Sequence, residues 1–206
     1  MKTAGIIGGS GYTGGELLRL VLQHPNLVLD FVYSTTRPNT PLSDTHQDLL
    51  GTTTLNFTDQ INFDVDVVFL CLGHGNSSRF LKENEFSQQT IIIDLSNDFR
   101  LNADQNFAER TFVYGLPELQ KNKIKNSKSI ANPGCFATAI QLALLPLAES
   151  KKIKDTLHIN ATTGSTGAGV GLSATSHFSW RNNNLSWYKP FTHQHLGEIR
   201  ETLNAT

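Results

Sequence analysis

Residues 4–17 read AGIIGGSGYTGGEL, and this stretch decides the fold. Residues 4–7 form a short apolar run typical of a buried strand, and we expect a helix over 13–23 directly after the glycines. Glycines in such a turn let the chain tighten and let N–H groups at the helix start approach a pyrophosphate. The candidate cofactor-binding residues of this turn are Gly8, Ser10, Gly11, Tyr12, Thr13 and Gly14. The alternative is a turn that serves only the packing of helix on strand.

The chain then repeats the alternation of short apolar strands with helices. We expect strands at 27–34, 65–72, 90–94 and 129–131, and a helix capped by Asn76 after the third strand. Runs of Val, Ile and Leu separated by helices are typical of a parallel sheet that is covered on both faces. The sequence therefore predicts an α/β fold with a doubly wound, mostly parallel Rossmann-type sheet.

The pattern changes after Cys135. We expect a helix over 136–149, which Pro146 kinks or shortens, then a strand near 156–162 and an amphipathic helix start at Glu198. The residues expected on the buried face of the first helix are Ala137, Ile140, Leu144 and Leu147. These features predict a dinucleotide-binding domain over 1–133 and a second, α+β domain over 134–206.

Composition excludes several classes of protein. The 206 residues carry a formal net charge of −1, with 17% charged and 38% hydrophobic residues, so there is no basic surface typical of nucleic-acid or membrane binding. The N-terminus enters the first strand directly, without a signal peptide, and two cysteines cannot form a disulfide framework. We therefore expect a cytoplasmic protein with no nucleic-acid or membrane partner.

The end of the second strand indicates which dinucleotide binds. An NAD-binding protein usually places Asp or Glu there for the ribose 2′-hydroxyl, but residues 34–37 read STTR. Hydroxyls and a guanidinium favour a 2′-phosphate, so Ser34, Thr35 and Arg37 predict NADP, although a solvated loop is the alternative. His74 and Gly75 follow the third strand at a carboxyl end of the sheet, where we expect the cofactor.

Cys135 is the candidate nucleophile. It follows Asn132, Pro133 and Gly134 at the start of a helix, where the helix dipole favours a thiolate. A small buried residue at a helix start is the alternative. Cys71 lies mid-strand between two leucines and is expected to be inert.

Several motifs together resemble the N-acetyl-γ-glutamyl-phosphate reductase family, which is related in fold and mechanism to aspartate-semialdehyde dehydrogenase. The motifs are GGSGYTGGEL (8–17), DLSNDFR (94–100), YGLPE (114–118), NPGC (132–135), GSTGAG (164–169) and HQH (193–195) followed by Glu198 and Ile199. They stand in the family's order and cover nearly the whole chain. Gly197 and Gln194 depart from the family's common proline and arginine.

The resemblance implies a chemistry and a set of roles. Cys135 is expected to attack an N-acyl-γ-glutamyl phosphate and form a thioester, which NADPH reduces to the semialdehyde in arginine biosynthesis. The His193-x-His195 pair would project to one side of an extended segment; we assign His195 as the base and His193 as an orienting or substrate contact. No third ligand supports a metal site. The candidate substrate-binding residues are Arg100, Asn132, Gly164, Ser165, Thr166 and Tyr188.

Several alternatives stay open at this point. Arg100 could instead form an ion pair with Asp94 or Asp98, and the glycine loop at 164–169 could be a simple turn. The sister activity on aspartyl phosphate, a thiol hydrolase and a non-catalytic dinucleotide-binding module are the rival functions. The resemblance further implies that residues 134–206 begin a catalytic and dimerisation domain that is incomplete at its C-terminus, in a chain that forms a homo-oligomer at full length. The identity of the N-acyl group is left open.

Overall fold

The computed structural model describes residues 1–203, in two compact units. The first unit is Met1–Asn132 and the second is Pro133–Thr206, so the division lies one residue before the predicted boundary. Each unit has its own hydrophobic core.

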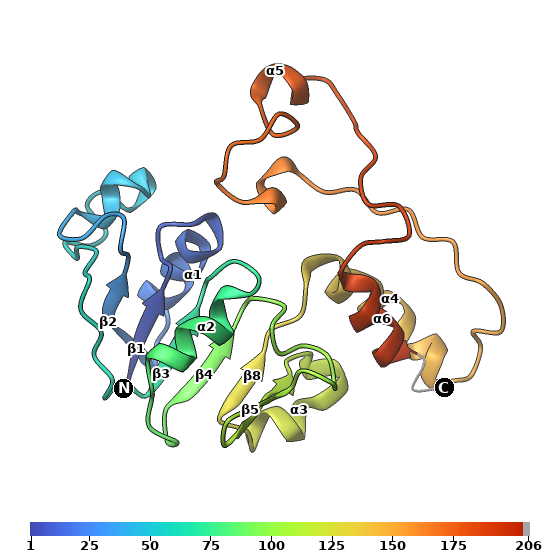
Figure 1. The fold of residues 1–206 in the computed structure, drawn as a ribbon, viewed down its shortest axis with the longest axis horizontal. Coiled ribbons are helices and arrows are strands. Elements are labelled where there is room, and N and C mark those ends of the chain that lie inside the picture. Colours follow the sequence, from blue (N-terminus) through green and yellow to red (C-terminus); the bar gives the residue numbers. More distant parts are fainter. Residues whose placement is uncertain (204–206) are drawn as a thin grey trace. The chain divides into compact units, whose positions relative to one another are not determined.

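The first unit is built on a six-stranded sheet in the order β2-β1-β3-β4-β8-β7, in which every pair of neighbours is parallel. The strands are β1 (Lys2–Ile7), β2 (Leu27–Tyr33), β3 (Val67–Leu70), β4 (Ile91–Asp94), β7 (Val113–Tyr114) and β8 (Ser129–Ala131). A separate antiparallel pair joins β5 (Asn106–Phe107) to β6 (Arg110–Thr111). The sheet confirms the predicted doubly wound class (Figure 1).

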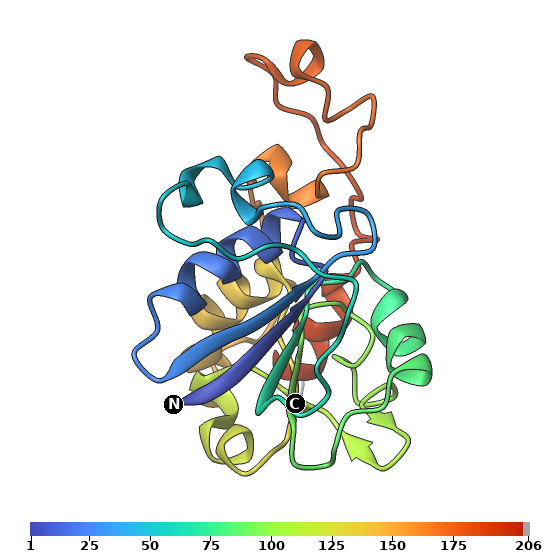
Figure 2. The ribbon, with the colours of Figure 1, turned by 90° about the vertical axis from the view of Figure 1, so that its left-hand side faces the viewer.

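Helices lie on both faces of this sheet. Figure 2 shows α1 (Tyr12–Leu22) on one face and α2 (Asn76–Glu83) on the other. Successive side chains of β1 point to opposite faces, so Ala4 and Ile6 pack in the cluster with α1, and Ile7 packs in the cluster with Leu81 of α2. The unit also holds α3 (Pro117–Lys125) and two short 3₁₀ turns, η1 (Leu42–Asp44) and η2 (Gln47–Leu49).

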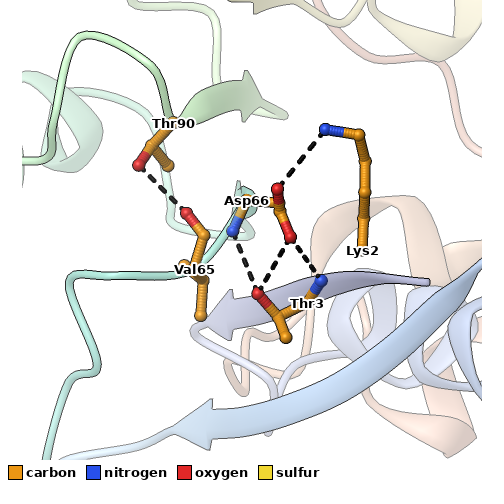
Figure 3. Close-up of polar contacts among 5 residues, drawn as sticks. All are labelled: Lys2, Thr3, Val65, Asp66 and Thr90. Carbon is orange, nitrogen blue, oxygen red and sulfur yellow. Dashed lines mark hydrogen bonds and ion pairs between the residues drawn. The ribbon is translucent and has the colours of Figure 1, made fainter.

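Polar side chains join the strands at the amino-terminal edge of the sheet, opposite the glycine turn (Figure 3). The Asp66 carboxylate accepts from the backbone N–H of Thr3 at 2.9 Å and from Lys2 Nζ at 3.4 Å. The hydroxyl of Thr90 donates to the carbonyl of Val65 at 3.0 Å. These bonds connect β1 with the residues that enter β3 and β4, and so help to set the register of three strands.

The second unit contains helices α4 (Cys135–Glu149), α5 (Phe178–Arg181) and α6 (His195–Leu203), and the 3₁₀ turn η3 (Ser165–Ala168). α4 and α6 pack side by side (Figure 1). Their shared core is apolar and consists of Ala137, Leu145, Ile199 and Leu203, with Ile140, Leu144 and Ala148 beside it.

Two expectations for the second unit were wrong. Leu147 is 47% exposed, because the buried face of α4 runs through Ala137, Gln141 and Leu145 instead. The helix itself ends at Glu149 as expected, so Pro146 does not shorten it. Residues 156–162 form no strand, because a strand needs a neighbour to pair its backbone and the described part of this unit contains none.

Much of the segment between α4 and α6 is exposed. Its large apolar side chains that face solvent include Leu172, Phe178, Leu185, Trp187 and Phe191. Within residues 1–203, no helix combines the length and the apolar character needed to cross a bilayer.

Candidate active site

The glycine turn between β1 and α1 has a shape that other residues cannot adopt. Gly8 has a φ of +79°, and a Cβ there would lie 2.7 Å from the carbonyl oxygen of Cys71. A Cβ on Gly14 would lie 2.6 Å from the Cα of Gly9. The turn is therefore as tight as the sequence predicted, with the backbone of α1 packed directly against the backbone of the turn.

The same turn presents backbone donors. Gly11 is the N-cap of α1 and makes no side-chain capping bond, so α1 opens without a side chain over its N–H groups. The first N–H groups of a helix have no acceptor within the helix, and together with the helix dipole they bind anions. A cradle that a Cβ would fill, lined by such donors, fits the pyrophosphate of a dinucleotide.

The end of β2 carries the residues predicted to read the ribose. Ser34 is buried and its hydroxyl lies 3.3 Å from that of Thr36, whereas Thr35 and Arg37 are exposed. The Thr40 hydroxyl donates to the backbone carbonyl of Arg37 at 2.9 Å, and the Arg37 side chain takes no part in this bond. The structure thus keeps Thr35, Thr36 and Arg37 exposed at this strand end, whereas Ser34 is buried and bonds within the turn.

The loop at residues 73–75 is held by Asp98, which the sequence analysis did not single out. Its carboxylate accepts from the N–H groups of Gly75 at 2.6 Å and Ser78 at 3.0 Å. Partial burial raises the pKa of Asp98, but these donors outweigh that effect and hold it below the ordinary value. Gly75, with a φ of 78°, is the N-cap of α2, not Asn76 as predicted, because the capping carboxylate comes from another loop. The position of Asp98, shortly after the buried strand β4, was the only signal in the sequence for this capping role.

Asp94 at the end of β4 is fully buried and accepts from two serines. Ser77 Oγ donates at 2.5 Å and Ser96 Oγ at 2.7 Å. Burial raises the pKa of Asp94 above its ordinary value, although both hydroxyls oppose the shift. Burial, with the charge of Asp94, also raises the pKa of Cys71 to about 12, in agreement with an inert thiol.

Arg100 lies beside Asn132, another predicted substrate-binding residue. Its guanidinium is buried and donates to the carbonyl oxygens of Asn132 at 2.8 Å and Leu95 at 2.9 Å. The Asn132 N–H in turn donates to the carbonyl of Asp94 at 2.7 Å. Arg100 therefore anchors the end of β8, directly before the residues that lead to Cys135.

Cys135 is the exposed first residue of α4, and Gly134 is its N-cap. The His195 ring lies against Gly134 so closely that a Cβ there would overlap the ring. His195 is buried at the start of α6, not in the extended segment that the two-residue spacing suggested. The imidazole thus packs on the residue directly before Cys135.

His193 joins this group through its neighbours. Its ring centre lies 4.5 Å from that of His195, and its Nδ1 accepts from the His195 backbone N–H at 3.2 Å. Its Nε2 lies 3.5 Å from the Tyr188 hydroxyl. Burial lowers the pKa of His193, and Lys189 lowers it further. Burial and the nearby Cys135 raise the pKa of Tyr188.

Two buried polar residues that the sequence analysis did not assign to the site support the cluster. Glu198 Oε2 accepts from the Gly134 N–H at 2.9 Å, and Gln141 donates to the Glu198 carbonyl at 3.1 Å and to Thr202 Oγ1 at 2.9 Å. The signal for Gln141 is a lone amide on the otherwise apolar helix face, and Glu198 was noted only as part of a motif.

The loop at residues 164–169, which was predicted to bind substrate, forms a 3₁₀ turn. Ser165 and Thr166 lie in η3 with Gly164 as the N-cap, and the backbone bonds of this turn, such as Gly167 N–H to the Gly164 carbonyl at 3.2 Å, are internal. Across residues 1–203, no three His, Cys, Asp or Glu side chains come together as metal ligands.

A parallel sheet with an anion-binding glycine turn at its first strand–helix junction defines a nucleotide-binding α/β protein, and the second unit adds a cysteine–histidine cluster. Comparison with known families gives two matches. Residues 3–127 match the semialdehyde dehydrogenase NAD-binding domain, and residues 135–206 match the semialdehyde dehydrogenase dimerisation domain. The chain belongs to the semialdehyde dehydrogenase family.

Individual proteins are also similar to this chain. The chain is 65% identical over 203 residues to N-acetyl-gamma-glutamyl-phosphate reductase of Flavobacterium johnsoniae, and 58% identical over 202 residues to the protein of that name in Christiangramia forsetii. Each alignment covers 98% of this chain but only 62% of the relative. Among solved structures, aspartate semialdehyde dehydrogenase with NADP from Candida albicans is similar with a TM-score of 0.52 and 16% identity, over 73% of this chain and 47% of that one, which supports the fold alone.

Proposed function

We propose that this chain acts as an NADPH-dependent reductase of an N-acyl-γ-glutamyl phosphate, forming the 5-semialdehyde and inorganic phosphate in arginine biosynthesis. The observation that carries the proposal is the Cys135 thiol at the start of α4 with the His195 ring packed on Gly134. The names of its relatives support the substrate class.

Cys135 is the nucleophile in this proposal. Its sulfur attacks the acyl carbon, the bond from that carbon to the phosphate oxygen breaks, and inorganic phosphate leaves with the bonding pair. The product is a thioester on Cys135. A hydride, which carries two electrons and one proton, together with one further proton then converts the thioester to an aldehyde and returns the sulfur as a thiol.

His195 is the proton carrier, since it lies against the residue next to Cys135. It accepts the thiol proton before attack and returns a proton when the thiol is released. His193 orients it, because the His193 Nδ1 accepts from the His195 N–H and the two rings are in contact. Burial and the nearby Lys189 lower the pKa of His193, which disfavours the protonated ring.

The glycine turn would hold the pyrophosphate of NADP, with Ser10, Tyr12 and Thr13 around the helix start and Thr35 and Arg37 near the 2′-phosphate. When bound, the cofactor supplies the hydride. Among the substrate residues, Tyr188 has the best support, because its hydroxyl lies beside His193. Arg100 and Asn132 act by fixing the main chain before Cys135.

A homo-oligomer and a cytoplasmic location belong to the same proposal. The match to a dimerisation domain and the exposed apolar side chains between α4 and α6 support association of copies. The requirement for a free Cys135 thiol supports a reducing compartment.

The test is the reverse reaction with the 206-residue chain. N-acetylglutamate semialdehyde, phosphate and NADP are mixed with the protein, and the absorbance of reduced cofactor is followed beside Cys135→Ser. We expect reduction by the unmodified chain and none by the variant, whereas Cys71→Ser should keep the rate. Aspartate semialdehyde in the same assay tests the sister substrate. Absence of reduction by the unmodified chain, or an equal rate in Cys135→Ser, would contradict the proposal.

A further inference from the structure

His46 is buried against the glycine turn, 37 residues along the chain from it. Its Nε2 lies 2.8 Å from the carbonyl oxygen of Gly9. The ring also covers Gly15, since a Cβ on Gly15 would lie 2.6 Å from Nδ1 and Cε1. A histidine from a distant polar segment therefore contacts both the glycine turn, at Gly9, and the first turn of α1, at Gly15.

The segment that carries His46 is fastened to α1. The guanidinium of Arg19 donates to both carboxylate oxygens of Asp48, at 2.6 and 2.7 Å. The buried side chains of Leu42 and Leu49 flank His46 in sequence and pack in the same core as Leu18. The backbone N–H of His46 donates to the carbonyl of Leu42 at 2.9 Å. His46 is thus held on the turn by both its backbone and its neighbours.

The bond to Gly9 fixes the direction of one peptide group. A carbonyl oxygen only accepts, so Nε2 of His46 is the donor. In a planar trans peptide the carbonyl and the next N–H point in opposite directions, so a Gly9 carbonyl turned toward His46 directs the Ser10 N–H away from it. The Gly9 backbone is also closely packed, because a Cβ at this position would overlap Val32.

We propose that His46 is a positioning residue for dinucleotide binding: by holding the Gly9 carbonyl it orients the Ser10 N–H toward the bound pyrophosphate. The inference rests on the proposed binding of NADP at this turn. It concerns the phosphate-binding half of the site and involves neither the thiol nor the substrate.

The experiment compares three substitutions at one position in the full chain. In His46→Gln the side-chain NH₂ can stand where Nε2 stands now and donate to Gly9. In His46→Asn the shorter side chain carries its NH₂ only as far as Nδ1, and His46→Ala has no donor. Kd is measured by fluorescence titration for NADP and for adenosine 2′-phosphate, which has no pyrophosphate. His158→Ala, an exposed histidine of the second unit, is the control, and urea unfolding is recorded for every variant.

We expect Kd for NADP to rise about tenfold in His46→Ala and His46→Asn, since one hydrogen bond is lost, and to stay within about threefold in His46→Gln. Kd for adenosine 2′-phosphate should stay within about twofold throughout. An unchanged Kd for NADP in His46→Ala overturns this inference alone. Equal weakening of both ligands overturns it too, because it indicates a general loss of structure. No binding of NADP by the unmodified chain overturns it together with the proposed dinucleotide site.

Discussion

The His195 ring rests on the Cα of Gly134, with no room for a Cβ between them. Gly134 is the N-cap of the helix that begins with Cys135, and its N–H donates to Glu198, three residues after His195. A buried carboxylate and a buried imidazole from α6 therefore meet the backbone just before Cys135. The close packing of these two helices gives the cluster its geometry.

Gly134→Ala should displace the His195 ring, because the added methyl occupies its place. We expect a loss of about 1–3 kcal/mol in the free energy of unfolding, and a reductase rate at least tenfold lower. Urea unfolding and the NADP reduction assay measure the two effects. Gly171→Ala is the matched control, since a Cβ there meets nothing within 4 Å. Equal behaviour of the two variants would show that the contact between Gly134 and His195 is unimportant.

Glu198→Ala removes the acceptor of the Gly134 N–H and should destabilise the second unit by about 1–3 kcal/mol, because a buried donor is left without that partner. Glu198→Gln keeps an acceptor oxygen and should cost less. Urea unfolding of both variants, beside the exposed control Arg200→Ala, tests the order. If Glu198→Gln is as unstable as Glu198→Ala, the hydrogen bond is not the reason.

Asp66 should make the first unit sensitive to acid. The Thr3 N–H lowers the pKa of Asp66 most, burial opposes this, and Lys2 lowers it further. Since the folded pKa lies below the unfolded value of about 3.9, the carboxylate stabilises the fold above that pH, and this contribution is lost as the pH falls through the folded pKa. Asp66→Asn should therefore lower the urea midpoint at pH 7, and the difference from the unmodified chain should shrink steadily as the pH falls below the unfolded value. A constant difference across this range would contradict the assignment; Asp64→Asn, an exposed neighbour, is the control.

Arg110 is buried at the amino-terminal side of β4 and β8, where Nη1 donates to the Thr90 carbonyl and the Ser129 hydroxyl, both at 3.2 Å, and Nη2 to the Ser87 carbonyl. Burial lowers the pKa of this guanidinium. Arg110→Lys keeps the charge but loses the planar guanidinium that donates through both Nη1 and Nη2. It should lower the free energy of unfolding by about 2 kcal/mol. The exposed Arg79→Lys should cost far less in the same urea titration. If Arg110→Lys lowers the free energy of unfolding no more than Arg79→Lys does, the hydrogen bonds of the Arg110 guanidinium do not stabilise the fold.

Arg37→Ala should raise Kd for NADP about tenfold and leave Kd for NAD unchanged, because the exposed guanidinium is proposed to meet the 2′-phosphate. Fluorescence titration with both dinucleotides measures the ratio of the two Kd values, and Arg79→Ala, an exposed arginine of α2, is the control. A parallel change for both dinucleotides would remove Arg37 from the 2′-phosphate site.

The sequence by itself determined the parallel sheet, the glycine turn and the helix that begins at Cys135. These depend on local patterns: apolar runs of strand length, glycines where no Cβ fits, and Pro133-Gly134 before a helical stretch. Only the tertiary structure decided that His46 reaches Gly9, that Asp98 caps α2, and that Gln141 rather than Leu147 lies on the buried face of α4. Such pairings join residues far apart in the chain, so neither periodicity nor spacing carries a signal for them. The strand expected near 156–162 failed for the same reason, because pairing depends on a neighbouring strand and not on the segment itself.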